Sequence, residues 1–467
     1  MTGRTVIRGG LVVTAADETH ADVLIEDGRI AAVAAHDSSV ARGWNGDTVI
    51  DATGKYVVPG GVDGHTHMEM PFGGTFASDT FETGTRAAAW GGTTTIVDFA
   101  VQSQGQPLRA GLDSWHGKAD GQCSIDYSFH MIVADVNDRT LKEMDILVEE
   151  GVTSFKLFMA YPGVFYSDDG QILQAMQRAS GNGGLIMMHA ENGIAIDVLV
   201  RQALAAGKTD PRYHGEVRHA LLEAEATHRA IQLARLAGAP LYVVHVSAQQ
   251  AVAELAAARD LGLPVFGETC PQYLFLSTDN LAEPDFEGAK YVCSTPLRPR
   301  EHQAALWQGL RTDDLQVVST DHCPFCFTGQ KELGRGDFSK IPNGMPGVEN
   351  RMDLLHQAVV EGRISRRRWI EIACAAPARM FGLYPRKGTL APGADADVVI
   401  YDPNAEQVIS AQTHHMNVDY SAYEGRRITG RVETVLSRGV PVITGRSYVG
   451  RAGHGQYVPR GLCQYLS

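Results

Sequence analysis

The chain has 467 residues, of which 44% are hydrophobic and 20% charged, a composition typical of a globular protein with one large and one smaller domain. Its formal net charge of −13 argues against nucleic acid or an anionic membrane as the main partner, because both require a basic surface. The sequence has no run of about 18–20 apolar residues, and residues 1–8 lack the features of a signal peptide. We therefore expect a cytoplasmic protein without membrane association.

The two ends of the chain have the alternating pattern of β-strands. The strands expected there are Thr5–Val13, Asp22–Glu26, Arg29–Ala34, Asp397–Tyr401, Arg431–Leu436 and Val440–Thr444. Asp27-Gly28 between two of them is a typical hairpin turn. Two β-rich ends that flank a long middle predict one discontinuous β-sandwich domain, formed by residues 1–55 and 386–467.

The middle of the chain, residues 56–385, alternates short apolar strands with helical stretches. The expected strands are Val57–Val62, Thr93–Phe99, Tyr127–Val133, Thr153–Phe158, Leu185–His189, Leu241–Val246, Pro264–Glu268 and Leu315–Thr320. The helices between them include Thr80–Trp90, Arg139–Glu150, Gln171–Ser180, Ala220–Ala237 and Ala248–Leu261. Eight such units predict an α/β fold, a TIM-like (β/α)8 barrel with insertions. A doubly wound open sheet is the alternative, and it is disfavoured because no G-x-G-x-x-G motif opens a helix.

Two histidines follow the first apolar run of this middle part. In an extended chain, residues i and i+2 point to the same side, so His65 and His67 can present both imidazoles to one point. Neutral imidazole is a ligand for zinc and related ions. A single His-x-His motif is more often a pair of exposed surface residues or a pair of hydrogen-bonded core residues. The metal hypothesis therefore depends on the other strand ends.

Barrel enzymes place their catalytic groups at the C-terminal ends of the strands. The strands expected at 153–158, 185–189, 241–246 and 315–320 bring Lys156, His189, His245 and Asp321 to this end, beside His65 and His67. Each residue alone has an ordinary explanation, such as a hydrogen-bonded core histidine or an aspartate that caps a helix. Six such coincidences at one end of a barrel are improbable, so the pattern predicts a metal site.

The lysine in this set requires a chemistry of its own, because a cation does not bind a cation. Burial in an apolar strand favours the neutral amine of Lys156, which can add CO2 and become an anionic carbamate. Such a group could bridge two metal ions about 3.5–4 Å apart. His65, His67 and Asp321 would then bind one ion, and His189 and His245 the other.

Six motifs carry a resemblance to a known family. They are Gly60–Phe72 (GGVDGHTHMEMPF), Phe155–Tyr161 (FKLFMAY), His189–Asn192 (HAEN), Tyr291–Arg298 (YVCSTPLR), Ser319–Phe325 (STDHCPF) and Ile341–Glu349 (IPNGMPGVE). With these motifs the chain resembles the cyclic amidohydrolases of the dihydropyrimidinase/D-hydantoinase family, over nearly its whole length. Three positions depart from the family's common pattern: Gly64 and Thr295 stand where proline is common, and Asn350 where an acid is common.

The resemblance implies two zinc ions per subunit, bridged by N6-carboxylated Lys156, with Asp321 as the acid/base residue. It implies that the Tyr161 phenol donates to the developing oxyanion, and that the backbones at Ser294 and Asn343 bind the ring. It also implies a homotetramer whose C-terminal tail, about residues 447–467, reaches a neighbour.

The expected reaction is zinc-dependent hydrolysis of the ring amide of cyclic ureides, as in pyrimidine catabolism. The substrates would be 5,6-dihydrouracil, dihydrothymine and 5-substituted hydantoins, opened to N-carbamoyl amino acids. Phe72, Phe158 and Phe165 would meet the ring substituent, although ordinary packing also explains them. An allantoinase- or dihydroorotase-like amidohydrolase is the alternative, and a non-catalytic scaffold homologue is a third reading. Dihydroorotate would require a cation in the pocket, and Pro71–Gly74 after the histidine pair offers none.

The seven cysteines are odd in number and scattered, unlike a secreted disulfide framework. Cys323-Pro-Phe-Cys326 is the one C-x-x-C motif, and a redox pair or half a zinc knuckle are alternatives. Since the motif has no second pair and directly follows Asp321-His322, we expect buried cysteines near the site.

Overall fold

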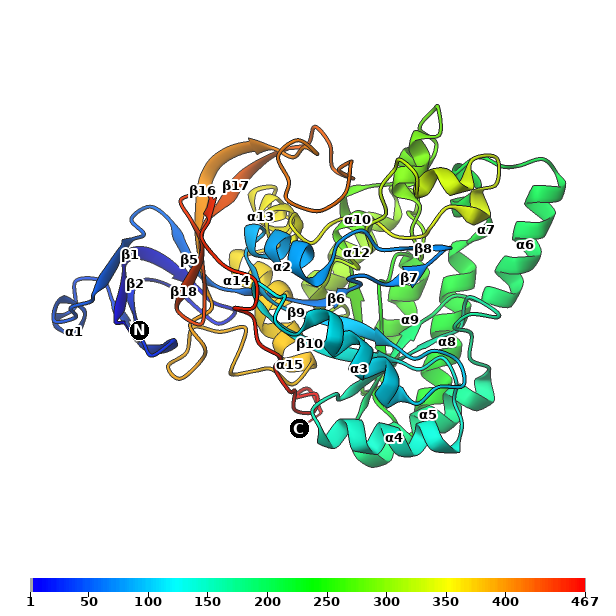
Figure 1. Cartoon of the computed structure of the whole chain (residues 1–467), viewed down its shortest axis with the longest axis horizontal. Coiled ribbons are helices and arrows are strands. Elements are labelled where there is room, and N and C mark those ends of the chain that lie inside the picture. Colours follow the sequence, from blue (N-terminus) through cyan, green and yellow to red (C-terminus); the bar gives the residue numbers. More distant parts are fainter. Residues whose placement is uncertain (1–2, 467) are drawn as a thin grey trace.

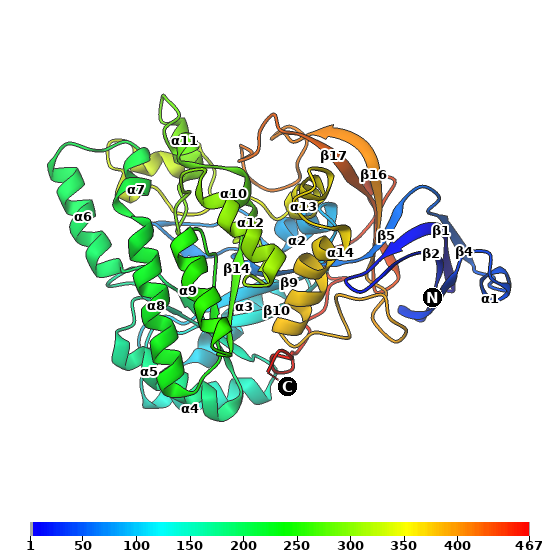
Figure 2. The ribbon, with the colours of Figure 1, turned by 180° about the vertical axis from the view of Figure 1, so that it is seen from behind.

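A computed structural model describes residues 3–466 (Figures 1 and 2). Eight parallel strands form the centre of the larger part of the molecule. They are β6 (Gly61–Thr66), β9 (Thr93–Val101), β10 (Asp126–Ile132), β11 (Ser154–Phe158), β12 (Leu185–His189), β13 (Leu241–Val243), β14 (Val265–Thr269) and β15 (Val317–Val318), and each pairs with the next in that order. An isolated bridge between Thr66 and His322 joins the first strand to the chain just after the last. The expected TIM-like (β/α)8 barrel is therefore confirmed.

Helices surround this barrel (Figure 1). They are α2 (Phe81–Trp90), α3 (Leu108–Ala119), α4 (Asp138–Glu149), α5 (Asp169–Asn182), α6 (Gly193–Ala205), α7 (Arg212–Val217), α8 (Ala220–Ala237), α9 (Gln249–Asp260), α10 (Pro271–Phe275), α11 (Thr278–Leu281), α12 (His302–Thr312), α13 (Arg351–Val360), α14 (Arg366–Ile370) and α15 (Ala376–Met380), with the 3-10 turns η1 (Glu287–Tyr291), η2 (Lys331–Gly334) and η3 (Phe338–Lys340) and the π-helical turn η4 (Glu371–Ala375). Side-chain caps start several of them: Thr80 and Asp168 each form a reciprocal capping box with the third residue of α2 and α5.

The two ends of the chain form one nine-stranded sheet. Its strands are β1 (Thr5–Val13), β2 (Glu18–Glu26), β3 (Arg29–Ala35), β4 (Thr48–Asp51), β5 (Tyr56–Pro59), β16 (Val398–Val408), β17 (Arg427–Ser437), β18 (Val440–Thr444) and β19 (Ser447–Tyr448), and α1 (Ser39–Arg42) lies before β4. Strand β5 pairs with β1 on one side and with β16 on the other, so it joins the N-terminal strands to the C-terminal ones. The expected discontinuous β domain is confirmed.

The prediction of a single strand over Val57–Val62 was wrong. The chain passes from one sheet to the other at Gly60, whose amide donates to Asp397 O in the nine-stranded sheet, whereas the amide of Gly61 donates to Gly92 O beside the barrel. A Cβ at Gly60 would lie 2.0 Å from Oγ1 of Thr94, so only glycine fits this crossing. Since residues 56–59 pair in the nine-stranded sheet, the domain limits at 55/56 and 385/386 stay a prediction.

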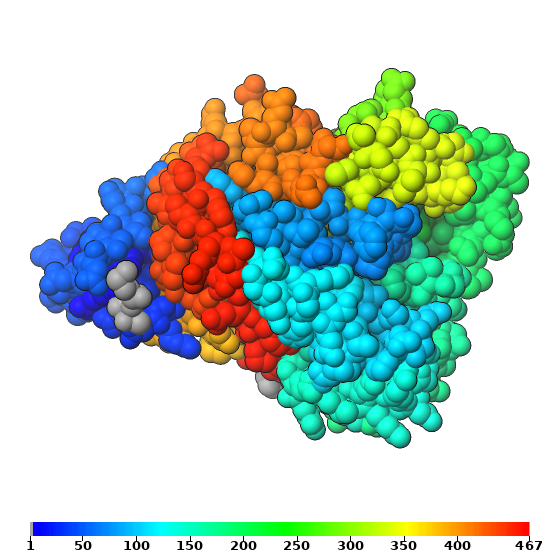
Figure 3. All heavy atoms as spheres, viewed as in Figure 1, coloured from blue at the N-terminus to red at the C-terminus, as the bar shows by residue number. Residues whose placement is uncertain are grey.

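The C-terminal segment packs against the barrel of its own chain. Figure 3 shows it (red) between the N-terminal strands (blue) and the residues of α3 (cyan). The amide of Val458 donates to Tyr127 O, and the buried guanidinium of Arg460 donates to Phe129 O and to Ser154 Oγ, at the N-terminal ends of β10 and β11. The expected contact of this segment with a neighbouring subunit stays a prediction. Among residues 3–466, no helix is both long and apolar enough to cross a membrane.

Candidate active site

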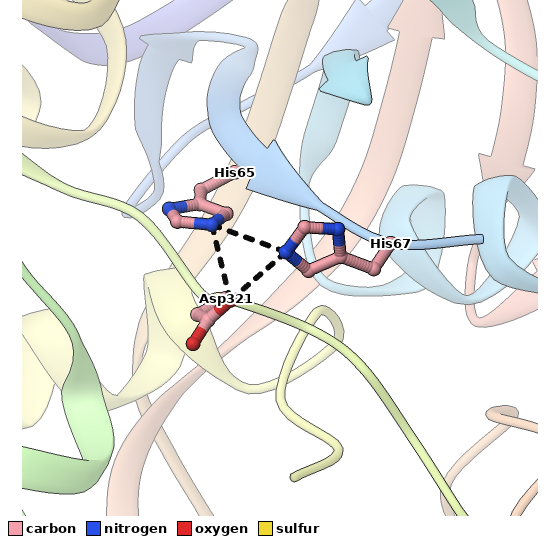
Figure 4. Close-up of side chains that lie close together, drawn as sticks. All are labelled: His65, His67 and Asp321. Atoms are coloured by element: carbon pink, nitrogen blue, oxygen red, sulfur yellow. Dashed lines mark hydrogen bonds and ion pairs between the residues drawn. The ribbon is translucent and has the colours of Figure 1, made fainter. Parts of the chain in front are cut away.

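Two histidines and an aspartate converge at the C-terminal end of the barrel (Figure 4). Nε2 of His65 lies 3.2 Å from Nε2 of His67, and Oδ1 of Asp321 lies 3.1 and 3.3 Å from these two atoms. All three residues are buried, and in the described part of the chain they are the one group with the spacing of metal ligands. A tetrahedral zinc ion with bonds of about 2.0–2.1 Å holds its ligand atoms roughly 3.3 Å apart. The donor set therefore fits a cation.

A buried carboxylate sets the orientation of the first histidine. Glu268 accepts a short hydrogen bond from Nδ1 of His65 and a second one, 2.8 Å long, from the hydroxyl of Tyr242. Because Nδ1 then carries the proton, Nε2 keeps its lone pair and directs it towards His67 and Asp321. This arrangement leaves lone pairs facing each other, which a cation between them would satisfy.

Lys156 extends the group into the barrel. Its Nζ lies 2.9 Å from Nε2 of His65 and 4.4 and 5.0 Å from the ring centres of Phe99 and Phe158. Burial lowers the pKa of Lys156 to about 8, although the carboxylates of Asp321 and Glu268 oppose this shift. A neutral amine is thus accessible near physiological pH, as the carbamate hypothesis requires.

The remaining two predicted ligands, His189 and His245, lie next to each other near His65. The rings of His189 and His245 are 4.5 Å apart, and that of His245 is 5.6 Å from His65. Nδ1 of His245 is buried without a hydrogen-bond partner within residues 3–466, as is Nδ1 of His67. Such orphaned atoms are costly in a stable fold. Ligation of a metal would satisfy Nδ1 of His245, whereas His67 faces the candidate metal position with its Nε2.

Glu191 and Arg218 orient the imidazole of His189. Oε2 of Glu191 lies 2.8 Å from Nε2 of His189 and 2.7 Å from Nη1 of Arg218. Burial opposes ionisation of Glu191, but the Arg218 guanidinium outweighs it and holds the pKa of this carboxyl far below its usual range. The carboxylate is therefore ionised, and it leaves Nδ1 of His189 as the nitrogen that can face a metal.

Three of the predicted site residues have left-handed backbones. The φ angles are 61° at Tyr161, 41° at His245 and 52° at Asp321. This region is uncommon for residues other than glycine and costs about 1–3 kcal/mol per residue. Such strain typically persists at functional sites, where the surrounding structure imposes it.

Two buried charges tie the first and last barrel strands together beneath the site. The carboxylate of Asp63 accepts from the amide and the hydroxyl of Thr320, at 3.1 and 2.7 Å. Nη1 of Arg351 donates to the carbonyl oxygens of Val62 and Val318, both at 3.0 Å. These contacts place Asp321 beside His65 although the two residues are far apart in the sequence.

A pocket opens above the candidate ligands and encloses about 430 Å³ of empty space, part of it open to solvent. Its walls include every predicted site residue except His65, which lies underneath. The lining residues are His67, Met70, Phe72, Lys156, Phe158, Tyr161, Phe165, His189, His245, Ser294, Asp321, Cys323, Asn343 and Gly344.

One wall of the pocket is aromatic and another is polar. The ring of Phe165 stacks on Phe158 at 5.0 Å and on Phe72 at 6.4 Å. On the polar wall, the amide of Asn343 donates to Ser294 Oγ at 3.0 Å. Burial raises the pKa of the Tyr161 phenol to about 12, only partly offset by Arg218, so the phenol keeps its proton at neutral pH. The structure brings all these predicted residues together; their roles stay predictions.

Several residues that position the site were not predicted from the sequence. Glu268 closes a predicted strand and Glu191 stands inside a quoted motif, so their places were visible although their partners were not. Asp63 and Arg351 gave no signal, because Asp63 contacts Thr320 across 257 residues and Arg351 contacts Val62 across 289. Contacts of this range follow from the closed barrel alone.

The three departures from the family pattern have distinct surroundings. A Cβ at Gly64 would lie 2.1 Å from the ring of Phe381, so the small residue matches that ring. The hydroxyl of Thr295 donates to His245 O at 3.0 Å. Asn350 is buried before α13, and its Oδ1 has no partner among the described residues.

All seven cysteines are free. Cys323 is buried in the pocket wall, as expected, whereas Cys326 is partly exposed and donates to Asn417 O.

Comparison with known proteins places this geometry in a family. Residues 56–442 match the amidohydrolase family. A D-hydantoinase from Streptomyces coelicolor is 83% identical over 467 residues, 100% of both chains. A D-hydantoinase from Geobacillus stearothermophilus is 52% identical over 458 residues, 97% of this chain and 96% of the relative. Among solved structures, the dihydropyrimidinase from Brevibacillus agri NCHU1002 is 50% identical, with a TM-score of 0.95 over 98% of this chain and 99% of that one.

Proposed function

This chain belongs to the amidohydrolase family and, within it, to the dihydropyrimidinase/D-hydantoinase family, and from this premise we propose which rings it opens and with which metal. It is a hydrolase of cyclic amides. Its proposed substrates are 5,6-dihydrouracil, dihydrothymine and 5-substituted hydantoins, opened to N-carbamoyl amino acids. The convergence of His65, His67 and Asp321 beside Lys156, at the floor of a pocket with an aromatic wall, carries the proposal.

The proposed cofactor is a pair of zinc ions bridged by carboxylated Lys156. His65, His67 and Asp321 would hold one ion, and His189 and His245 the other. The orphaned Nδ1 of His245 and the position of Lys156 Nζ next to Nε2 of His65 support this assignment. Zinc in such a centre supplies a Lewis acid and a water acidic enough to act as a nucleophile near neutral pH.

The reaction consumes one water and breaks one ring amide bond. The water oxygen forms a bond to the carbonyl carbon, the C–N bond breaks, and a proton reaches the leaving ureido nitrogen. Asp321 is the proposed carrier of that proton, because its carboxylate faces the pocket next to both histidines. His322 is a poor substitute, since its Nε2 pairs with Asp79 and its Nδ1 accepts from the amide of Gly347.

Tyr161 is the proposed donor to the carbonyl oxygen as negative charge develops there. A phenol that keeps its proton at neutral pH can donate, and its place in the pocket wall next to Phe72 and His189 suits that role. The left-handed backbone at Tyr161 turns this side chain into the pocket instead of along the strand.

The polar wall is proposed to bind the ring and the aromatic wall its substituent. Ser294 and Asn343 offer backbone groups to the –NH–CO–NH–CO– unit that dihydrouracil and hydantoins share. Phe72, Phe158 and Phe165 favour an apolar or aromatic substituent. A carboxylate there would lack a partner, because Arg218, near Tyr161, is already paired with Glu191.

The test is a side-by-side assay of the purified, zinc-loaded enzyme. Dihydrouracil, dihydrothymine, both enantiomers of 5-phenylhydantoin, dihydroorotate and allantoin would be compared by kcat/KM. We expect activity on the first three rings, with the D-hydantoin preferred in line with the names of the relatives. A tenfold or greater preference for dihydroorotate or allantoin would overturn the assignment.

A homotetramer and a cytoplasmic location also stay predictions. Light scattering coupled to size exclusion would test the first, with a mass near four chains of 50.5 kDa as the expected result.

A further inference from the structure

A lysine outside the metal site is fully buried, and no carboxylate of residues 3–466 pairs with it. Lys331 begins η2 and has no exposed surface. Burial lowers the pKa of Lys331 to about 7, but the three carbonyl oxygens around its Nζ favour the ammonium, because a neutral amine would turn its lone pair towards one of them. Burying an ammonium in this way is costly unless every N–H group finds an acceptor, so its hydrogen bonds identify what the residue holds.

All three N–H groups of Lys331 are used by backbone carbonyls. Nζ lies 2.9 Å from Val292 O, 2.7 Å from Pro342 O and 2.7 Å from Gly344 O. An ammonium has three donors and no acceptor, so these bonds saturate it. The three hydrogen bonds of the cation thus join two segments of chain about 50 residues apart.

These two segments are the ones that form the polar wall of the pocket. Val292 stands two residues before Ser294, and Pro342 and Gly344 flank Asn343. The segments also meet directly, because the amide of Gly344 donates to Val292 O and the side chain of Asn343 donates to Ser294 Oγ, both at 3.0 Å. A change at Lys331 therefore acts on both sides of the proposed ring-binding wall at once.

The second segment has little freedom to adjust. Gly344 has a φ of 155°, and a Cβ there would lie 2.2 Å from Cys323 O, so the backbone is pressed against the pocket wall. The carbonyls of Pro342 and Gly344 both accept hydrogen bonds from the ammonium of Lys331. Lys331, which is not among the pocket-lining residues, thus holds a segment whose Asn343 and Gly344 line the pocket.

We propose that Lys331 is a positioning residue for the cyclic substrate: its ammonium fixes the Ser294 and Asn343 segments at the separation at which their backbone groups meet the ring. The inference rests on the proposed function, in which these two residues bind the ring. We expect these backbone contacts to be equally strong in the ground state and the transition state, and such uniform binding lowers KM without raising kcat. Losing the three hydrogen bonds of Lys331 should therefore raise KM and leave kcat nearly unchanged.

The test substitutes Lys331→Met, which keeps the length and apolar volume of the side chain and removes all three donors. Lys290→Met is the matched control: Lys290 lies two residues before Val292, and its Nζ pairs with Glu287 on the protein surface. We expect KM for dihydrouracil to rise about tenfold or more in Lys331→Met, with kcat within about threefold of wild type. The control should keep both constants.

Hydrogen exchange measured by mass spectrometry gives a readout independent of catalysis. Peptides that cover residues 290–297 and 340–348 should exchange faster in Lys331→Met, while peptides from β11 and β12 stay unchanged. If Lys331→Met does not fold, Lys331→Gln, which keeps two N–H donors, serves for both measurements with a smaller expected rise.

The outcomes separate the two claims. A fall in kcat without a rise in KM, or equal exchange in both variants, would overturn the role of Lys331. Exchange that accelerates evenly over the whole barrel would also overturn it, because the residue would then be merely structural. A wild-type enzyme that opens none of the rings would overturn the proposed function, and the exchange data would still decide whether Lys331 joins the two segments.

Discussion

Nζ of Lys156 lies 2.9 Å from Nε2 of His65, the same nitrogen that faces His67 and Asp321. A protonated amine at this distance would repel any cation held by the two histidines. The lysine can coexist with metal ions only as a neutral amine or as an anion. The fit of the donor set to a metal thus argues against a protonated Lys156, a condition that the proposed carbamate meets.

Replacing Lys156 should prevent the site from binding its proposed metal ions. Lys156→Ala is expected to weaken metal binding by about 100-fold or more and to abolish turnover, because a ligand shared by two ions is lost. Metal per chain would be measured by mass spectrometry of the digested protein. Lys118→Ala is the control: this lysine donates to Glu69 O near the site but faces no ligand. Two ions retained per chain in Lys156→Ala would exclude the bridge.

Asp321→Asn tests the proton carrier. The variant should fold, keep much of its metal, and lose about two to four decades in kcat, the range expected for a positioned acid/base group. Rates would be normalised to bound zinc, so that a loss of metal is not mistaken for a loss of proton transfer. A normalised kcat within tenfold of wild type would assign the proton to another group.

Tyr161→Phe tests the phenol in the same assay. Removing one donor to a developing oxyanion costs about 3–4 kcal/mol in the barrier, so kcat should fall by roughly 10²–10³. Tyr166→Phe is the matched control, since Tyr166 lies on the same turn, outside the pocket lining. A change confined to KM in Tyr161→Phe would indicate ground-state binding instead.

The barrel and its six candidate ligands could be predicted because one simple rule applies to both. Five of the candidate ligands follow or lie near the end of an apolar strand and Lys156 lies inside one, and the C-terminal ends of parallel strands meet at one end of a barrel. Strand β12 has the predicted limits, Leu185–His189. The strand at 57–62 failed for a physical reason: a continuous apolar run does not reveal that the chain changes sheets at Gly60.

The groups that hold the site in place could not be predicted. Glu268 pairs with His65 across 203 residues, and Lys331 reaches Val292 across 39. Nothing local distinguishes a glutamate that orients a histidine from one that faces solvent. Only the closed barrel specifies such pairs, so the convergence of the candidate ligands could be predicted and the residues that support them could not.

The ring of Phe381 is predicted to leave room only for glycine at position 64. In Gly64→Ala the new Cβ would clash with Phe381, and overpacking of this kind costs about 1–3 kcal/mol. A lowered Tm by scanning fluorimetry is the expected result. Phe381→Leu removes the ring atoms involved, so Gly64→Ala should cost less in that background. Equal losses in both backgrounds would show that the ring does not matter.

Asp353 should make stability depend on pH. Its carboxyl accepts from the Tyr401 hydroxyl and the Gln407 amide, and burial raises its pKa to about 7. Since the folded state then binds the proton more tightly than the unfolded chain does, this contribution is full below about pH 4 and is lost as the pH rises through 7.

Asp353→Asn removes that titration. The Tm of the variant relative to wild type should rise between pH 5 and 8, by an amount equivalent to at most a few kcal/mol, at about 1.4 kcal/mol per pKa unit. Asp402→Asn is the control, because the pKa of Asp402, which pairs with Lys55, is lowered instead. The decrease in Tm of Asp402→Asn relative to wild type should be constant from pH 5 to 8. Parallel curves for wild type and Asp353→Asn from pH 5 to 8 would show that the Asp353 carboxyl stays ionised in the folded protein.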